Sequence, residues 1–318
     1  MGGKNFIASG LSALVEILER EKRRGAGTID LSPESEALLR AMPAAFMQAR
    51  RPVAADTRVE MKPGEMLRPP QSRVEPNSVM PKATKATGKR FPIPSVAEAD
   101  RTEAWVRAQL NAIFKAVKSC PDCLALGTLF ETVVFAAGNP RAGIMFVGDA
   151  PEYEEEKERK PFIGPAGQKL DQILKAMGLP RDQVYLTNIV KFRPKKGDGR
   201  FQSASDRSPQ EEEMAVSLPY VLAEIEVVRP QVIVALGRTA AEGLLEHGGS
   251  LASFREGRHE IGGIPVIVTC DLRYVLRQES DGDAERAKAA KRLVWEDMLR
   301  VMDRVGMPVT EKQRNFFL

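Results

Sequence analysis

The residues best suited to chemistry in this 318-residue chain follow directly after its strongest apolar runs. Two carboxylates, Asp149 and Asp271, and one carboxamide, Asn188, stand at such places. A carboxylate can orient a water molecule or stabilise positive charge, and a carboxamide offers one acceptor together with a pair of donors. These residue types at these places predict a polar ligand site.

The apolar runs predict the scaffold that positions these residues. They cover residues 144–147, 184–188, 232–237 and 266–269, and helical patterns near 166–177, 211–227 and 239–245 separate them. Continuous runs of this kind predict parallel strands that are buried on both faces. Ligands bind beyond the carboxyl ends of such strands. We therefore expect an α/β fold of three α/β/α layers around a central, mostly parallel four-stranded sheet, with an N-terminal helical and disordered extension.

The texture of the sequence divides the chain into three parts. We expect residues 1–49 to form a helical extension, in which 4–23 has an amphipathic pattern suited to docking or dimerisation. Residues 50–94 form a basic, proline-rich linker, for which we expect disorder because it cannot bury enough apolar surface. Residues 95–318 form the packed α/β domain. The charged linker is either an arm that attracts DNA or a solvated tether.

Composition excludes some classes of protein. No run of 18 apolar residues is present, so we expect no membrane-spanning segment. Three cysteines cannot build a disulfide framework, and together with the lack of a signal peptide they predict a cytoplasmic protein. The net charge of +4 is only a weak indication of an anionic partner.

Several motifs at the expected strand ends occur in a fixed order between about residues 115 and 300. They are Gly148-Asp149-Ala150-Pro151, the segment KPFIGPAG at 160–167, TNIVKFRP at 187–194, RPQVIVALG at 229–237, and GIPV at 263–266. The ordered set resembles the uracil-DNA glycosylase superfamily, most closely its bacterial thermostable, iron–sulfur branch (family four). The resemblance implies a monofunctional enzyme that hydrolyses the N-glycosidic bond of uracil, or of a related deaminated or modified base, in DNA.

The resemblance also implies roles for individual residues. Gly148, Ala150, Phe162 and Asn188 would bind the extruded base, with the Phe162 ring stacked on it and the Asn188 amide on its imide edge. Asp149, where the family has glutamate, would activate water or stabilise an oxocarbenium-like sugar. Each residue also has a purely structural alternative. Phe162 could belong to the core, Asn188 could cap a turn, and Asp149 could cap the following helix or loop.

The second catalytic motif departs from the family pattern. The family has a histidine-containing H-P-S-x-L-L-R motif, and this chain has Asp271 at the start of the aligned segment 271–277. We include Asp271 among the catalytic candidates, although an ionised carboxylate only accepts hydrogen bonds and would oppose a developing oxyanion. Arg273 could compensate with a fixed positive charge, or could instead grip a phosphate. Glu152, which replaces the family's glycine, adds a carboxylate, and we expect the acidic run 154–156 to be a solvated loop.

Basic side chains near these motifs are candidates for contact with DNA. The segment 195–210 is rich in glycine and serine and has a basic tilt, which suits phosphate contact; a merely solvated loop is the alternative. The DNA-binding residues that we expect are Lys191, Arg193, Lys195, Arg273 and Arg277.

The cysteines also depart from the family pattern. The branch holds a [4Fe–4S] cluster with four cysteines; this chain keeps Cys120 and Cys123, but has Phe192 and Ser217 at the other two positions. Two thiolates do not satisfy such a cluster. We therefore expect no cofactor and no metal site, with Phe192 packed into part of the cluster's volume.

Two functions remain open at this point. One is the DNA glycosylase. The other is a catalytically impaired glycosylase-fold module that binds DNA, or binds a protein partner through the N-terminal helix. Asp271 and Glu152 are the residues that motivate this alternative.

Overall fold

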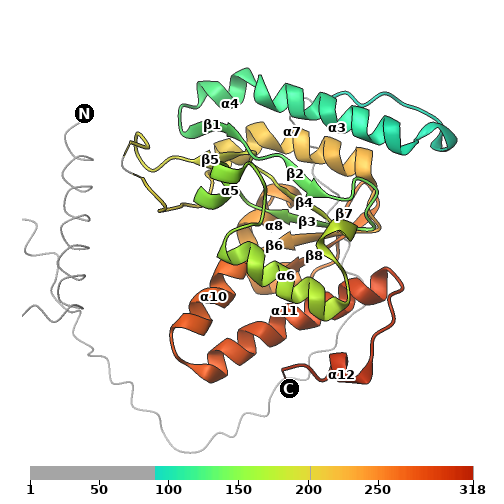
Figure 1. Cartoon of the computed structure of the whole chain (residues 1–318), viewed down its shortest axis with the longest axis vertical. Helices are drawn as coiled ribbons and strands as arrows, with labels where there is room; N and C mark the ends of the chain where they lie inside the picture. The colour runs from blue at the N-terminus through green and yellow to red at the C-terminus, as the bar shows by residue number, and fades with distance from the viewer. Residues whose placement is uncertain (1–89, 201, 318) are drawn as a thin grey trace, which may run out of the picture. The chain divides into compact units, whose positions relative to one another are not determined.

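The computed structural model describes residues 90–200 and 202–317 (Figure 1). The expected helix at 4–23, the extension 1–49 and most of the linker 50–94 lie outside these residues. The predicted division of the chain, and the docking of a protein partner on the N-terminal helix, therefore stay predictions. None of the described helices combines the length and the apolar character that crossing a bilayer requires.

A six-stranded sheet with the order β2-β4-β3-β6-β8-β7 forms the centre of the domain. Its four inner strands are parallel, which confirms the expected α/β fold and mostly parallel sheet. The two edge strands are antiparallel and widen the predicted four-stranded sheet to six. Each edge strand has only three residues, too few to produce an apolar run. In spatial order the strands are β2 (Ala136–Gly138), β4 (Tyr185–Asn188), β3 (Ile144–Gly148), β6 (Val232–Leu236), β8 (Ile264–Thr269) and β7 (His259–Ile261).

Helices cover both faces of this sheet and complete three layers (Figure 1). On one face Phe146 and Val234 pack against one group of helices; on the other face Met145 and Ile233 pack against a second group. The first group is α6 (Pro165–Met177), α10 (Leu272–Ser280) and α11 (Ala284–Arg304), and the second is α7 (Glu211–Val228), α8 (Arg238–Leu245) and α9 (Leu251–Glu256).

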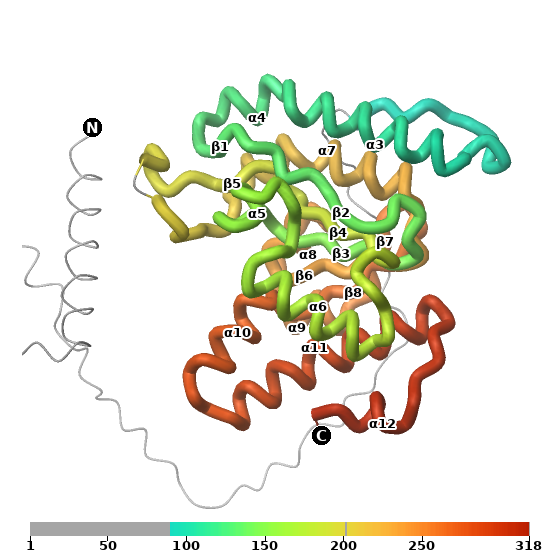
Figure 2. Tube along the Cα trace, viewed as in Figure 1, coloured from blue at the N-terminus to red at the C-terminus, as the bar shows by residue number. Residues whose placement is uncertain are grey.

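A smaller layer packs on the outer side of α7. Helix α3 (Glu103–Lys118) lies beside α7, as Figure 2 shows. The short helix α4 (Pro121–Ala125) continues it and leads into β1 (Leu129–Val133), which pairs with β5 (Phe192–Pro194) in a two-stranded sheet. The remaining elements are α5 (Tyr153–Glu158), α12 (Glu311–Arg314) and the 3₁₀ turns η3 (Glu98–Asp100) and η4 (Arg181–Gln183).

The register of the parallel strands brings the predicted site residues to one edge. Gly148 at the end of β3 pairs with Asn188 at the end of β4. On the other side of β6, β8 ends at Thr269, and two residues later Asp271 caps the N-terminus of α10. The carboxyl ends of neighbouring parallel strands thus carry Asp149, Asn188 and Asp271, as the sequence predicted.

A buried ion pair supports the strand end that carries Asn188. Lys191 and Glu224 have fully buried side chains and form an ion pair. The Lys191 ammonium donates to the Thr187 hydroxyl at 2.6 Å and to the Asn188 carbonyl at 2.7 Å, and Tyr185 donates to Glu224 at 2.9 Å. This placement corrects the expectation that Lys191 contacts DNA, because its ammonium is enclosed and already paired.

Replacing Lys191 with methionine should lower the free energy of unfolding by about 3–5 kcal/mol, because it leaves the Glu224 carboxylate buried without its cation. The double variant Lys191→Met/Glu224→Gln should recover much of that loss. Urea unfolding followed by circular dichroism measures both changes. Weaker DNA binding by Lys191→Met at unchanged stability would restore Lys191 as a DNA contact.

Candidate active site

Gly148, Asn188 and Phe162 meet where β3 and β4 end. A side chain on Gly148 would collide with the Asn188 carboxamide oxygen and would come within 2.8 Å of the tip of the Phe162 ring. Asn188 is 2% exposed and Phe162 is 6% exposed, so both are shielded from water. The structure thus brings these three expected base-binding residues together. Ala150 is also buried, but it packs in the apolar cluster that contains Cys120.

The Asn188 amide nitrogen is buried and has no hydrogen-bond partner among the described residues. An unsatisfied buried donor costs about 1–3 kcal/mol, and a polar ligand that accepted its hydrogen bond would remove that cost. If Asn188 capped a turn through this amide group, its N–H would already have a hydrogen-bond partner. The contacts therefore favour a ligand-binding role for Asn188 over the turn-capping alternative.

Phe162 has an unusual backbone that neighbouring groups hold in place. Its φ of 56° lies in the left-handed region, which is unfavourable for a bulky residue. The Phe162 N–H donates to the Glu155 carboxylate at 2.7 Å, and Arg181 donates to the carbonyls of Phe162 and Pro161 at 2.5 and 2.7 Å. Such strain persists where the surroundings over-determine the conformation. The ring also packs in the core, so the core alternative and a stacking role coexist.

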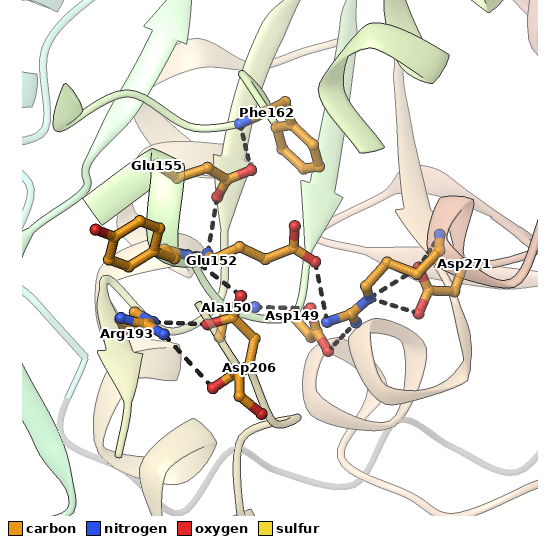
Figure 3. Close-up of polar contacts among 11 residues, drawn as sticks. Asp149, Ala150, Glu152, Glu155, Phe162, Arg193, Asp206 and Asp271 are labelled. Carbon is orange, nitrogen blue, oxygen red and sulfur yellow. Dashed lines mark hydrogen bonds and ion pairs between the residues drawn. The ribbon is translucent and has the colours of Figure 1, made fainter. Parts of the chain in front are cut away.

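Asp149, Glu152 and Asp271 all converge on Arg273. The Arg273 guanidinium donates to Asp149 at 2.7 Å and to Asp271 at 2.9 Å, and it lies 3.5 Å from Glu152. Figure 3 shows the carboxyl groups of Asp149, Glu152 and Asp271 turned toward this one guanidinium. The other oxygen of Asp149 accepts the Ala150 N–H at 2.9 Å. Asp149 is therefore fixed at the end of β3 by one backbone donor and one cation.

Burial changes the protonation of the carboxyl groups in this region. It raises the pKa of Glu152 to about 6, with Arg273 opposing the shift, and it raises the pKa of Glu155 to about 8. Burial also raises the pKa of Asp271, against the effect of Arg273.

The basic residues expected to contact DNA differ in their surroundings. Arg193 is 3% exposed, pairs with Asp206 and Glu156, and lies between the rings of Phe130 and Tyr153. These contacts hold the segment after β5 against α5, and Figure 3 shows the pair with Asp206. This placement corrects the expectation that Arg193 contacts a phosphate.

The other expected DNA contacts lie nearer the surface. Lys195 is half-buried over Phe130, whereas Arg277 is exposed on α10. Arg273 is engaged by the carboxyl groups described above. Lys195 and Arg277 therefore remain the candidates for phosphate contact.

Glu155 is the residue of this region that the sequence did not reveal. The acidic run 154–156 was expected to be a solvated loop, but it forms α5, and Glu155 is only 3% exposed. Its second carboxylate oxygen accepts the Glu152 N–H at 3.3 Å, as in a capping box. One sequence signal could have identified Glu155: a glutamate at the third position of a helix often accepts the backbone N–H of the residue that caps the helix.

The pKa of Glu155 predicts how stability depends on pH. Between its ordinary pKa of 4.5 and about 8, the folded protein keeps a proton that the unfolded chain has released. The free energy of unfolding should therefore fall as pH rises from 5 to 8, by up to about 1.4 kcal/mol per pH unit from this group. Glu155→Gln should flatten the fall, since glutamine does not titrate. Urea titrations at several pH values test this, with the exposed Glu154→Gln as control; parallel curves for wild type and Glu155→Gln would contradict it.

Comparison with known proteins agrees with the geometry of this edge. The uracil DNA glycosylase superfamily model matches residues 135–299. The type-4 uracil-DNA glycosylase of Thermotoga maritima is 35% identical over 193 residues, which are 59% of this chain and 91% of that protein. The type-4 enzyme of Sulfurisphaera tokodaii is 42% identical over 130 residues, 41% of this chain and 54% of that protein. These relatives give no support to the catalytically impaired alternative.

The comparison overturns the expectation that the protein lacks an iron–sulfur cluster, because the type-4 glycosylases are iron–sulfur proteins. In this structure Cys120, Cys123 and Phe192 are buried together in one apolar part of the core. The Ser217 hydroxyl is also buried, and it has no hydrogen-bond partner in the described residues. No group of three or more histidine, cysteine, aspartate or glutamate side chains in that part of the chain is arranged to hold a metal. Within the described residues, this corner offers two buried thiols, Cys120 and Cys123.

The match of the family model spans more than half of the chain, and the Thermotoga relative is covered almost completely. The fold and the residues at the strand ends agree with both. The chain belongs to the uracil-DNA glycosylase superfamily, and the two relatives named above are type-4 enzymes.

Proposed function

We propose that this protein is a monofunctional DNA glycosylase that hydrolyses the N-glycosidic bond of uracil, or of a related deaminated base, in DNA. The observation that supports the proposal most is the buried Asn188 amide beside Phe162 and Asp149, which has no hydrogen-bond partner in the described part of the chain. A base extruded from the duplex offers the carbonyl that this amide lacks and a flat face for an aromatic ring.

The reaction breaks the bond between the sugar C1′ and the base nitrogen. The bonding electron pair leaves with the base, so positive charge grows on the sugar and negative charge on the base. The Asp149 carboxylate stabilises the positive sugar and orients the water whose oxygen adds to C1′. The proton released by that water and the proton taken up by the base balance the hydrolysis.

The residues around this edge support hydrolysis rather than strand cleavage. A glycosylase that also cleaves the strand needs an amine to form a Schiff base with the sugar. Lys191, the lysine nearest to Asn188 in the sequence, is fully buried and paired with Glu224. Lys195 and Arg277 are proposed to hold the DNA backbone.

The direct test incubates purified full-length protein with oligonucleotides that contain a single uracil, then treats them with alkali to cut abasic sites. We expect strand scission only after alkali, because the enzyme releases the base without cleaving the backbone. Matched oligonucleotides with thymine serve as the control. If uracil, hypoxanthine and xanthine are all retained, the protein is not a glycosylase of deaminated bases.

Asn188→Ala separates function from stability. It removes an unsatisfied buried donor, so the protein should lose little stability, whereas base release should slow by about 10²–10³-fold, the range typical for loss of one catalytic hydrogen-bond donor. Single-turnover kinetics and thermal unfolding measure the two effects. Asn111→Ala, at an exposed position of α3, is the control. Full activity of Asn188→Ala would remove the residue from the base-binding set.

A further inference from the structure

Arg273 is held between two carboxylates of the site in a fixed geometry. Asp271 accepts the Arg273 backbone N–H at 2.9 Å as the N-cap of α10, and the same carboxylate accepts the Arg273 Nε–H at 2.9 Å. One terminal nitrogen of the guanidinium donates to Asp149 at 2.7 Å. The side chain is 25% exposed, so part of it remains accessible to solvent or to a ligand.

Some N–H groups of the Arg273 guanidinium make no hydrogen bond to the described residues. Arginine has five N–H donors, and it never accepts a hydrogen bond. Nε–H and one N–H of the nitrogen beside Asp149 serve the two aspartates, while the other terminal nitrogen makes only the 3.5 Å ion pair with Glu152 in the described chain. Burial disfavours the charged guanidinium, but the Coulombic effects of Asp149 and Asp271 outweigh it and raise the pKa of Arg273. The group is therefore a permanent cation with free donors.

Asp271 cannot donate a hydrogen bond to the departing base, which is the role that the resemblance implies for the histidine of the family motif. Its carboxylate is occupied by the backbone and side chain of Arg273, and in its ionised form it has no proton to donate. The transition state nevertheless develops negative charge on the departing base. Among the described residues, Arg273 supplies the positive charge that pairs with Asp149.

We propose that Arg273 is a catalytic residue that donates hydrogen bonds to the departing base, and that Asp271 is a positioning residue that aims its guanidinium. This inference rests on the proposed glycosylase function and assigns the group that stabilises its leaving anion. It also gives a reason for the departure from the family motif, because Asp271, which replaces the histidine, holds Arg273 two residues later.

The test compares two leaving bases in single-turnover assays. Arg273→Gln should slow release of uracil by about 10²–10³-fold, as expected for loss of an oxyanion donor. The same variant should lose less with 5-fluorouracil, because fluorine stabilises the base anion and reduces its need for a donor. Arg273→Lys keeps the charge but has too few donors in the right geometry for both aspartates and the base. It should therefore slow base release less than Arg273→Gln does, and again more for uracil than for 5-fluorouracil.

Asp271→Asn keeps a helix cap but loses the ionic hold on Arg273. It should lower kcat less than Arg273→Gln does, and the two changes should be non-additive in the double variant. Arg277→Gln, on the exposed side of α10, should raise KM equally for both bases, as loss of a phosphate contact does. Arg286→Gln, an exposed arginine of α11, is the neutral control.

The outcomes separate the alternatives. An equal loss for both bases, or a change in KM alone, in Arg273→Gln would overturn this inference in favour of a phosphate grip. Full uracil activity in that variant would also overturn it while leaving the glycosylase intact. A wild type inactive on both bases would overturn the proposed function itself. Thermal unfolding checks each variant, and Arg273→Lys carries the comparison if Arg273→Gln does not fold.

Discussion

The parallel alignment of β4, β3, β6 and β8 is the constraint on which the rest of the structure depends. Parallel strands bring their carboxyl ends to one edge, and their hydrogen bonds fix which residues become neighbours there. Gly148 thereby lies beside Asn188, and its missing side chain leaves room for the Asn188 amide and the Phe162 ring. Asp149 follows directly, and the start of α10 brings Arg273 to it from a distant part of the chain.

Polar groups inside the domain hold this edge in shape. The Lys191–Glu224 pair lies under the end of β4, Glu155 holds the backbone of Phe162, and Arg193 ties the segment after β5 to α5. Each of these groups is buried and satisfied by specific partners, so each restricts the positions of the loops that it contacts. The carboxyl edge of the sheet therefore depends on buried supporting side chains as well as on the residues proposed to contact a substrate.

The sequence predicted the fold class, the parallel strands and the family because these depend on local patterns and on ordered motifs. It could not reveal the edge strands β2 and β7, which are too short for a pattern of their own. Nor could it distinguish the basic residues that meet solvent from those that meet carboxylates far away in the sequence. Lys191 and Glu224 are 33 positions apart, and Arg273 and Asp149 are 124 apart. Such pairs depend on the tertiary arrangement, so charge alone suggested a DNA contact where the structure has an internal ion pair.

The internal use of cations has a consequence for the physical chemistry of DNA association. Lys191, Arg193, Arg207 and Arg273 are neutralised by carboxylates of the domain itself. The affinity of a protein for duplex DNA falls with ionic strength in proportion to the number of phosphates it neutralises, because each releases condensed counterions. These four side chains add little to that number. The proposed DNA complex should therefore owe little of its dependence on ionic strength to these four side chains.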